Sequence, residues 1–161
     1  MNLFGLQGVG EIILVNCAAW LVVHLAAAGA CSLLPWQRFD AHAFPYRHRR
    51  WEREGRIFQT VFRVRAWKSR LPDLGKFRKK RLASRSREYL RQYVAESCRA
   101  ELTHLIVILA VPLFIVWNNW IAAACMVPYA LIENLPCIIA QRYNRGKILR
   151  ILEPGLRFYN K

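Results

Sequence analysis

A glutamate and a histidine stand three residues apart where a charged stretch of the sequence meets a long apolar one. They are Glu101 and His104, within ESCRAELTHLIVIL at residues 96–109. On a helix, residues with this spacing share a face, and a carboxylate beside an imidazole can orient the ring for work as a general base. The same pair could instead form an interfacial cap at the end of a membrane span. The spacing alone leaves both interpretations open.

A second polar group interrupts the far end of the next apolar stretch, in ENLPCIIAQRYNR at residues 133–145. Asn134 would lie about two helical turns, or roughly 10 Å, inside that end. Polar side chains at such a depth usually face a protein interior or a water-filled cavity. If the two apolar stretches form an antiparallel hairpin, these polar groups meet at one membrane face; ordinary interhelical hydrogen bonding is the alternative. The residues expected to converge are Arg99, Glu101, His104, Asn134, Gln141, Arg142 and Arg145.

Three apolar stretches must position these residues. Residues 11–34 contain one charged side chain, Glu11, and exceed the roughly 20 residues that a membrane helix needs. No positive charge precedes this stretch and it is too long for a typical signal peptide. Residues 102–140 are too long for one helix, and WNNW at 117–120 combines turn-forming Asn with Trp typical of membrane interfaces. We therefore predict spans at about 11–34, 102–117 and 120–140, the second either crossing or re-entering, with a crossing hairpin favoured.

The distribution of charge predicts the orientation. The chain is 55% apolar yet carries a formal charge of +15, and its Lys and Arg residues lie between positions 38 and 99 and after 141. The positive-inside rule then places a segment of about 36–101 and a tail of 142–161 in the cytoplasm, with the N-terminus outside. Ser84 or Ser86 is expected to cap an amphipathic helix that runs on into the second span. The prediction is an all-α integral membrane protein with one domain, 1–161.

Other signals narrow the possible chemistry. The five cysteines are odd in number and contain no CxxC pair, so we expect reduced packing residues with neither disulfides nor a metal site. A glycine-rich phosphate loop, a GxSxG elbow and a His-x4-Asp pattern are all missing from the sequence. His24, in the middle of the first span, is expected to be structural. The basic charge would suit nucleic acid, anionic lipid or a coenzyme phosphate, and it does not by itself choose among them.

Three stretches of the sequence resemble a known family. VRAWKSRLPD (64–73), CRAELTHL (98–105) and ENLPCIIAQRYNR (133–145) look like the glycosyl-4,4'-diaponeurosporenoate acyltransferases, small bacterial membrane proteins, over roughly residues 15–152. The named member attaches a fatty acyl chain to the glucose of a carotenoid glycoside. The sequence departs from the family where Leu105 follows the histidine in place of a frequent Trp, and where Leu74 separates Asp73 from Gly75.

The resemblance implies an acyltransferase of the bacterial cell membrane, and the residues suggest roles in that reaction. A sugar hydroxyl must lose its proton as it attacks an activated acyl carbonyl, so His104 is the predicted base and Glu101 its orienting partner. Asn134 or Arg99 would stabilise the oxyanion. Lys68, Arg142 and Arg145 would hold coenzyme phosphates, and Trp67 and Tyr143 would stack on sugar or adenine or simply pack. The predicted substrate-binding set is Trp67, Lys68, Asp73, Gln141, Arg142, Tyr143, Asn144 and Arg145.

The partners expected from this interpretation are the bilayer, an acyl donor and a lipid-linked sugar acceptor, with no nucleic acid. No cofactor is expected, and acyl-coenzyme A or an acyl carrier protein would serve as the donor substrate. The alternative is a non-enzymatic basic membrane scaffold that binds anionic lipid or a protein partner. A scaffold would depend on its Lys and Arg residues collectively, whereas an enzyme would depend on His104. The oligomeric state stays open.

Overall fold

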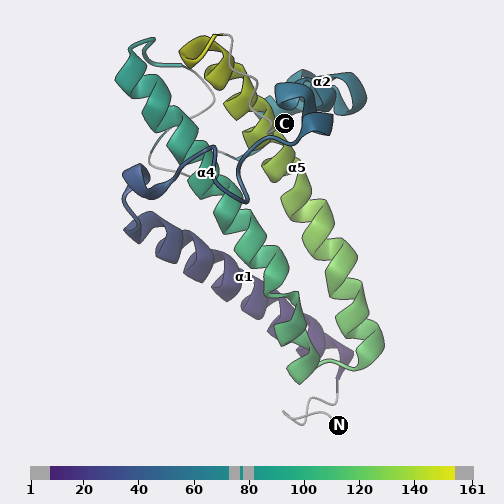
Figure 1. Cartoon of the computed structure of the whole chain (residues 1–161). Helices are drawn as coiled ribbons and strands as arrows, with labels where there is room; N and C mark the ends of the chain where they lie inside the picture. The colour runs from purple at the N-terminus through teal and green to yellow at the C-terminus, as the bar shows by residue number, and fades with distance from the viewer. Residues whose placement is uncertain (1–7, 73–76, 78–81, 155–161) are drawn as a thin grey trace.

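The computed structural model describes residues 8–72, 77 and 82–154, and every regular element within them is helical. Figure 1 shows their arrangement. The elements in chain order are α1 (Val9–Leu33), η1 (Trp36–Arg38), η2 (Arg50–Gly55), α2 (Arg56–Phe62), α3 (Val64–Trp67), η3 (Lys68–Arg70), α4 (Arg87–Leu109), η4 (Val111–Val116) and α5 (Trp120–Leu152).

Three helical stretches are long and apolar enough to cross a membrane: α1, α4 together with η4, and α5. This confirms the predicted fold class. The boundaries differ from the prediction in two places. The α-helical part of the second stretch ends at Leu109 and the chain continues as a 3-10 helix, where Pro112 lacks the N–H that an α-helix would use. The third helix runs on to Leu152, so residues 142–152 of the predicted tail are its last turns.

The start of α4 and the turn before α5 follow local capping rules. Ser86 Oγ accepts a hydrogen bond from the Tyr89 backbone N–H at 3.3 Å, which confirms the predicted cap and the continuous helix into the second span. Asn119, in the WNNW turn, caps α5 by accepting from the Ala122 N–H at 2.8 Å. The neighbouring Asn118 exchanges side-chain hydrogen bonds with Asn16 of α1. The hairpin turn is therefore tied to the first helix.

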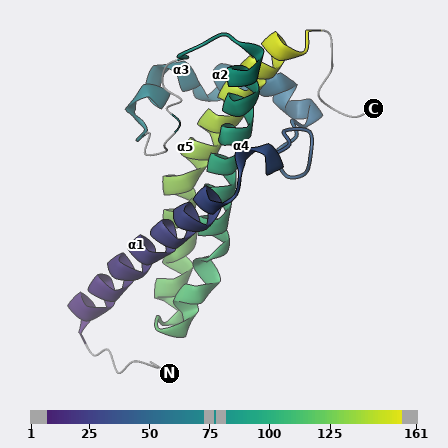
Figure 2. The same cartoon turned by 90° about the vertical axis from the view of Figure 1, so that its left-hand side faces the viewer.

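The helices α4 and α5 lie side by side and antiparallel, and α1 crosses them at an angle (Figures 1 and 2). A buried cluster that includes Trp20, Val107, Phe114 and Ala130 joins all three helices. We call the end at which α4 begins and α5 ends the basic end, because the Arg-rich segment 36–72 folds there. A second cluster at this end, which includes Phe39, Tyr46, Leu90, Tyr93 and Ile148, packs that segment against both helices.

A close backbone approach fixes η2 against α5. A Cβ added to Gly146 would lie 2.1 Å from the Glu54 carbonyl oxygen, so only glycine allows the two backbones to meet. The chain beside this contact is left-handed at Arg53, Glu54 and Gly55, with φ values of 47°, 58° and 82°, a conformation that is uncommon for residues with side chains. Arg150 also donates to the Glu54 carbonyl at 2.6 Å. The position of η2 therefore depends on this contact.

We expect Gly146→Ala to destabilise the protein, because the added methyl group forces η2 away from α5. Overpacking of this kind typically costs about 1–3 kcal/mol, occasionally more. Thermal unfolding in detergent would measure the loss. Gly29→Ala is the matched control, since nothing lies within 4 Å of a Cβ on Gly29 in α1, and alanine is the better helix former. A melting temperature for Gly146→Ala equal to that of Gly29→Ala would contradict the role assigned to this contact.

Candidate active site

Two arginines of α5 and two glutamates form a buried ionic network. Arg142 Nε donates to Glu101 Oε1 at 2.7 Å, and Arg145 Nη2 donates to Glu101 Oε2 at 2.5 Å. Arg142 also pairs through Nη1 with Glu52 of η2. Glu52 and Glu101 are each 1% exposed and Arg145 is 0% exposed. The two positive and two negative charges balance, as buried charges require.

The same arginines hold the segment that precedes η2. Arg142 Nη2 donates to the Pro45 carbonyl at 2.6 Å, and Arg145 Nη2 donates to the Tyr46 carbonyl at 2.8 Å. The guanidinium of Arg145 has no exposed surface with which to meet a phosphate, and that of Arg142 is engaged by three protein groups. Their predicted contact with a coenzyme therefore does not fit this geometry, and both act within the protein.

His48 is held by a carboxylate that belongs to this network. Its Nδ1 lies 2.6 Å from Glu52 Oε2, so the imidazole donates its Nδ1–H to the carboxylate and keeps a lone pair on Nε2. The ring is buried, and Nε2 has no hydrogen-bond partner among the described residues. A buried polar nitrogen without a partner is costly and calls for a functional explanation. A carboxylate that accepts from Nδ1–H and an Nε2 with no partner of its own match the arrangement of a general base.

Electrostatics keep this pair in the form that a base needs. Burial lowers the pKa of His48, and the nearby Arg145 and Arg142 lower it further, against the opposing effect of Glu52. Burial alone would raise the pKa of Glu52, but the hydrogen bond from His48 and the charge of Arg142 bring it below its ordinary value. At neutral pH the imidazole is therefore neutral and the carboxylate ionised.

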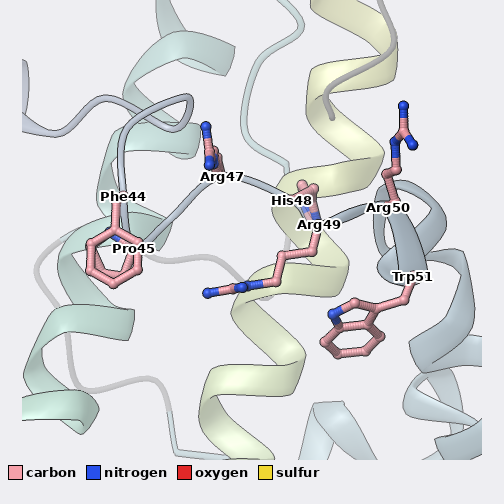
Figure 3. A pocket seen from close by; sticks show the side chains of 7 residues that line it. All are labelled: Phe44, Pro45, Arg47, His48, Arg49, Arg50 and Trp51. Atoms are coloured by element: carbon pink, nitrogen blue, oxygen red, sulfur yellow. The ribbon is translucent and has the colours of Figure 1, made fainter. Parts of the chain in front are cut away.

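A cavity of about 310 Å³ lies against this histidine. Figure 3 shows the side chains that line it, all from one continuous stretch of the segment before and within η2. The lining residues are Phe44, Pro45, Arg47, His48, Arg49, Arg50 and Trp51. The sequence analysis missed His48 and Glu52. Their separation of four residues was a usable signal, but the stretch around them has no helical periodicity to draw attention to it.

His104 lies between α4 and α5 and is oriented by Asn134. Its Nδ1 is 2.8 Å from Asn134 Oδ1, while Asn134 Nδ2 donates to the Ala130 carbonyl at 2.9 Å. The predicted meeting of His104 with Asn134 across the hairpin is thus present. Asn134, and not Glu101 as predicted, orients the imidazole of His104. Both Glu101 oxygens accept hydrogen bonds from arginines instead.

Arg99, which was predicted as an oxyanion donor, contacts Glu96 and the end of α1 instead. It pairs with Glu96 at 2.9 and 3.0 Å, donates to the Leu34 carbonyl at 2.5 Å and lies over the Phe39 ring. These contacts join the end of α1 to α4. They direct the guanidinium toward α1 rather than toward the network, so the geometry does not support Arg99 as an oxyanion donor.

The remaining predicted binding residues gather on α3, η3 and α5. Lys68 Nζ donates to Asn144 Oδ1 at 2.5 Å and lies 5.0 Å from the centre of the Tyr143 ring. Burial lowers the pKa of Lys68, and the charges of Lys147 and Arg65 add to that effect. Trp67 Nε1 donates to the Phe62 carbonyl at 2.7 Å.

Two of the predicted binding residues stand apart from that group. Gln141 Oε1 is buried and has no hydrogen-bond partner within the part of the chain that the structure describes. Asp73, the other, lies outside the described residues.

The described part of the chain is all helical, and its three long helices fit a membrane protein. A histidine–carboxylate pair lies beside a cavity. These are the features of a membrane enzyme. Residues 42–154 match the glycosyl-4,4'-diaponeurosporenoate acyltransferase family. The chain therefore belongs to that family, as the resemblance predicted, and is an acyltransferase.

Curated relatives agree with this assignment. The chain is similar to the glycosyl-4,4'-diaponeurosporenoate acyltransferase of Staphylococcus haemolyticus strain JCSC1435, with 29% identity over 84% of this chain and 81% of the relative. It is 30% identical to that of Staphylococcus aureus strain MRSA252 over 83% of each chain. No solved structure matches.

We expect Glu101→Ala to be strongly destabilising, because it leaves Arg145 buried without its carboxylate. Breaking a buried ion pair on one side typically costs about 3–5 kcal/mol. Thermal unfolding in detergent micelles would measure the change, with Glu88→Ala as the control, since Glu88 is exposed on the same helix. Equal melting temperatures for the two variants would show that the network does not hold the fold.

Proposed function

We propose that the protein transfers an acyl group from a thioester donor to a sugar hydroxyl of a lipid-linked glycoside. A carotenoid glycoside is the first candidate acceptor, because the named relatives are carotenoid glycoside acyltransferases. The observation that carries the proposal is the buried pair of His48 and Glu52, with Nδ1 bound to the carboxylate and Nε2 without a hydrogen-bond partner among the described residues, at a residue that adjoins a cavity. The donor is acyl-coenzyme A or an acyl carrier protein, and the reaction needs no further cofactor.

The pair can move the proton that the reaction displaces. His48 Nε2 takes the proton of the sugar hydroxyl as its oxygen attacks the thioester carbonyl carbon. The C–O bond forms, the tetrahedral intermediate collapses with loss of the C–S bond, and the imidazolium returns its proton to the leaving sulfur. Glu52 stabilises the transient imidazolium, and Arg142 holds Glu52 in place. Glu101 and Arg145 act through Arg142 as positioning residues.

His48 is a better base than His104 on electrostatic grounds. A carboxylate partner stabilises the imidazolium, whereas the neutral amide of Asn134 orients the ring of His104 without supplying charge. His104 is partly exposed and lies one helical turn from Glu101, toward the apolar part of the bundle. We therefore propose that His104 and Asn134 contact the acceptor, whose sugar must stay close to its lipid tail.

The proposed orientation follows from charge. With the N-terminus outside and the C-terminus in the cytoplasm of a bacterial cell, the basic end of the bundle faces the compartment that supplies acyl thioesters. The scaffold alternative accounts for the basic charge but gives no reason for a buried imidazole that is held by a carboxylate and whose other nitrogen has no partner among the described residues.

We expect His48→Gln to lower kcat for acyl transfer by about 10²–10⁴-fold, the usual contribution of general-base assistance. The assay is acyl transfer to a glycolipid by protein purified in lipid nanodiscs, with folding checked by monodisperse elution. His42→Gln is the control, since His42 is exposed, pairs with Glu153 and takes no part in this mechanism. Loss of activity in well-folded His104→Gln with retention in His48→Gln would reverse the two assignments.

The pH profile separates a catalytic from a structural role for His48. Because its pKa lies below the ordinary 6.5, kcat/KM should be constant near neutral pH and fall only as the pH drops below that value. Glu52→Gln removes a charge that raises this pKa, so the acid limb should move to lower pH while kcat falls. An acid limb that stays in place would argue that Glu52 only supports the fold.

A reporter that is active only in the periplasm tests the orientation. We expect no activity when it follows Lys161 and full activity when it is inserted after Gly10, because positive charge keeps the basic end inside. A cytoplasmic reporter at the same two sites should give the opposite pattern and serves as the control. A periplasmic signal from the Lys161 fusion would overturn the proposed topology.

A further inference from the structure

The cavity beside His48 presents positive charge that the protein itself does not neutralise. Arg47, Arg49 and Arg50 line it with exposed side chains. No described acidic residue forms an ion pair with any of the three. Arg142 and Arg145 of α5 differ, because Glu52 and Glu101 neutralise their charges. Three like charges within four positions repel one another, so an anion bound among them would relieve that repulsion.

The flanking residues favour an anion that also carries an aromatic ring. Trp51 is 60% exposed and Phe44 is 77% exposed, one toward each end of the lining stretch. Figure 3 shows Arg49 extending between these two aromatic side chains. Arginine binds phosphate through two parallel hydrogen bonds, and exposed aromatic faces stack on nucleobases. The lining thus matches a phosphorylated nucleotide better than a simple anion.

The size and position of the cavity limit what it can take. Its volume of about 310 Å³ stands at the lower end of the roughly 300–1,000 Å³ typical of small-molecule sites. It can hold the nucleotide portion of a large donor while the remainder extends away. His48 belongs to the same lining, so a donor whose nucleotide is anchored there lies on the part of the protein that carries the proposed base.

We propose that this cavity binds the phosphate-bearing nucleotide of an acyl-coenzyme A donor, with Arg47, Arg49 and Arg50 as the phosphate contacts and Trp51 as the stacking surface. The inference rests on the proposed acyl transfer and names its donor. It also replaces the donor-binding role first expected of Arg142 and Arg145. The phosphate of an anionic lipid headgroup shares the same recognition chemistry, so the experiment must separate the two sources.

Direct binding of coenzyme A tests the site without requiring turnover. The full chain in phosphatidylcholine nanodiscs is titrated with radiolabelled coenzyme A. We expect each of Arg47→Gln, Arg49→Gln and Arg50→Gln to weaken binding by about tenfold, the usual effect of losing one charge-assisted hydrogen bond. Arg91→Gln, an exposed arginine of α4, is the matched control and should bind as wild type does. Equal affinity in all four variants overturns the proposal.

Two further experiments distinguish the phosphates of coenzyme A from the phosphate of an anionic lipid headgroup. If coenzyme A does not bind in phosphatidylcholine nanodiscs, and phosphatidylglycerol binds in a way that depends on the three arginines, the site recognises lipid and the proposal fails. If acyl transfer proceeds from acyl carrier protein but not from acyl-coenzyme A, the proposal also fails, although the proposed reaction stands. Binding of coenzyme A that depends on the arginines supports the site even where transfer to the chosen acceptor is absent.

A kinetic measurement separates failure of the proposed donor site from failure of the proposed acyl transfer. With acyl-coenzyme A as donor, the arginine variants should raise the donor KM by about tenfold, with a smaller effect on kcat, because the phosphate contacts are present before and during reaction. Transfer with an unchanged donor KM in all three variants would place the donor elsewhere on the protein. That result would leave the acyl transfer itself intact.

Discussion

The carboxylate of Glu101 holds together the parts of the protein that form the site. Its two oxygens accept hydrogen bonds from Arg142 and Arg145, and these arginines in turn reach Glu52 and the carbonyls of Pro45 and Tyr46. One carboxylate on α4 therefore fixes two side chains of α5, and through them the segment that carries His48. Without it, the guanidinium of Arg145 would lie in an interior that cannot solvate it, and Arg142 would keep only Glu52 as an acidic partner.

This arrangement explains why so much charge lies inside a small helical protein. Buried ion pairs contribute little net stability, because desolvation offsets their attraction. They do fix geometry, since each charge tolerates few alternative positions. Here the geometry concerns a short irregular segment in which the large apolar side chains of Phe44 and Trp51 are exposed, and a network anchored on two long helices gives that segment a defined place. The proposed base thus has the rigidity of the bundle although it lies outside a long helix.

The sequence was most informative where structure is local. The lengths of the apolar stretches predicted the three long helices, the candidate caps Ser84 and Ser86 predicted the start of α4, and WNNW predicted the turn. The hairpin these imply brought His104 and Asn134 together, as the structure has them. The sequence could not say whether Arg142 and Arg145 point inward or toward solvent, because both environments accept arginine near a helix end. It also could not place residues 44–52, whose position depends on the Gly146 contact and on bonds from α5.

The length of α5 ties the site to the thickness of the membrane. Its 33 residues extend about 50 Å, whereas the hydrocarbon core of a bilayer measures about 30 Å. The helix is therefore longer than a bilayer core is thick, and Arg142 and Arg145 lie toward its C-terminal end. A thicker or thinner bilayer changes the tilt of a long spanning helix at modest cost, and a tilt of α5 would move these two arginines relative to the headgroups. Lipid composition would then influence the position of the site in addition to the residues that form it.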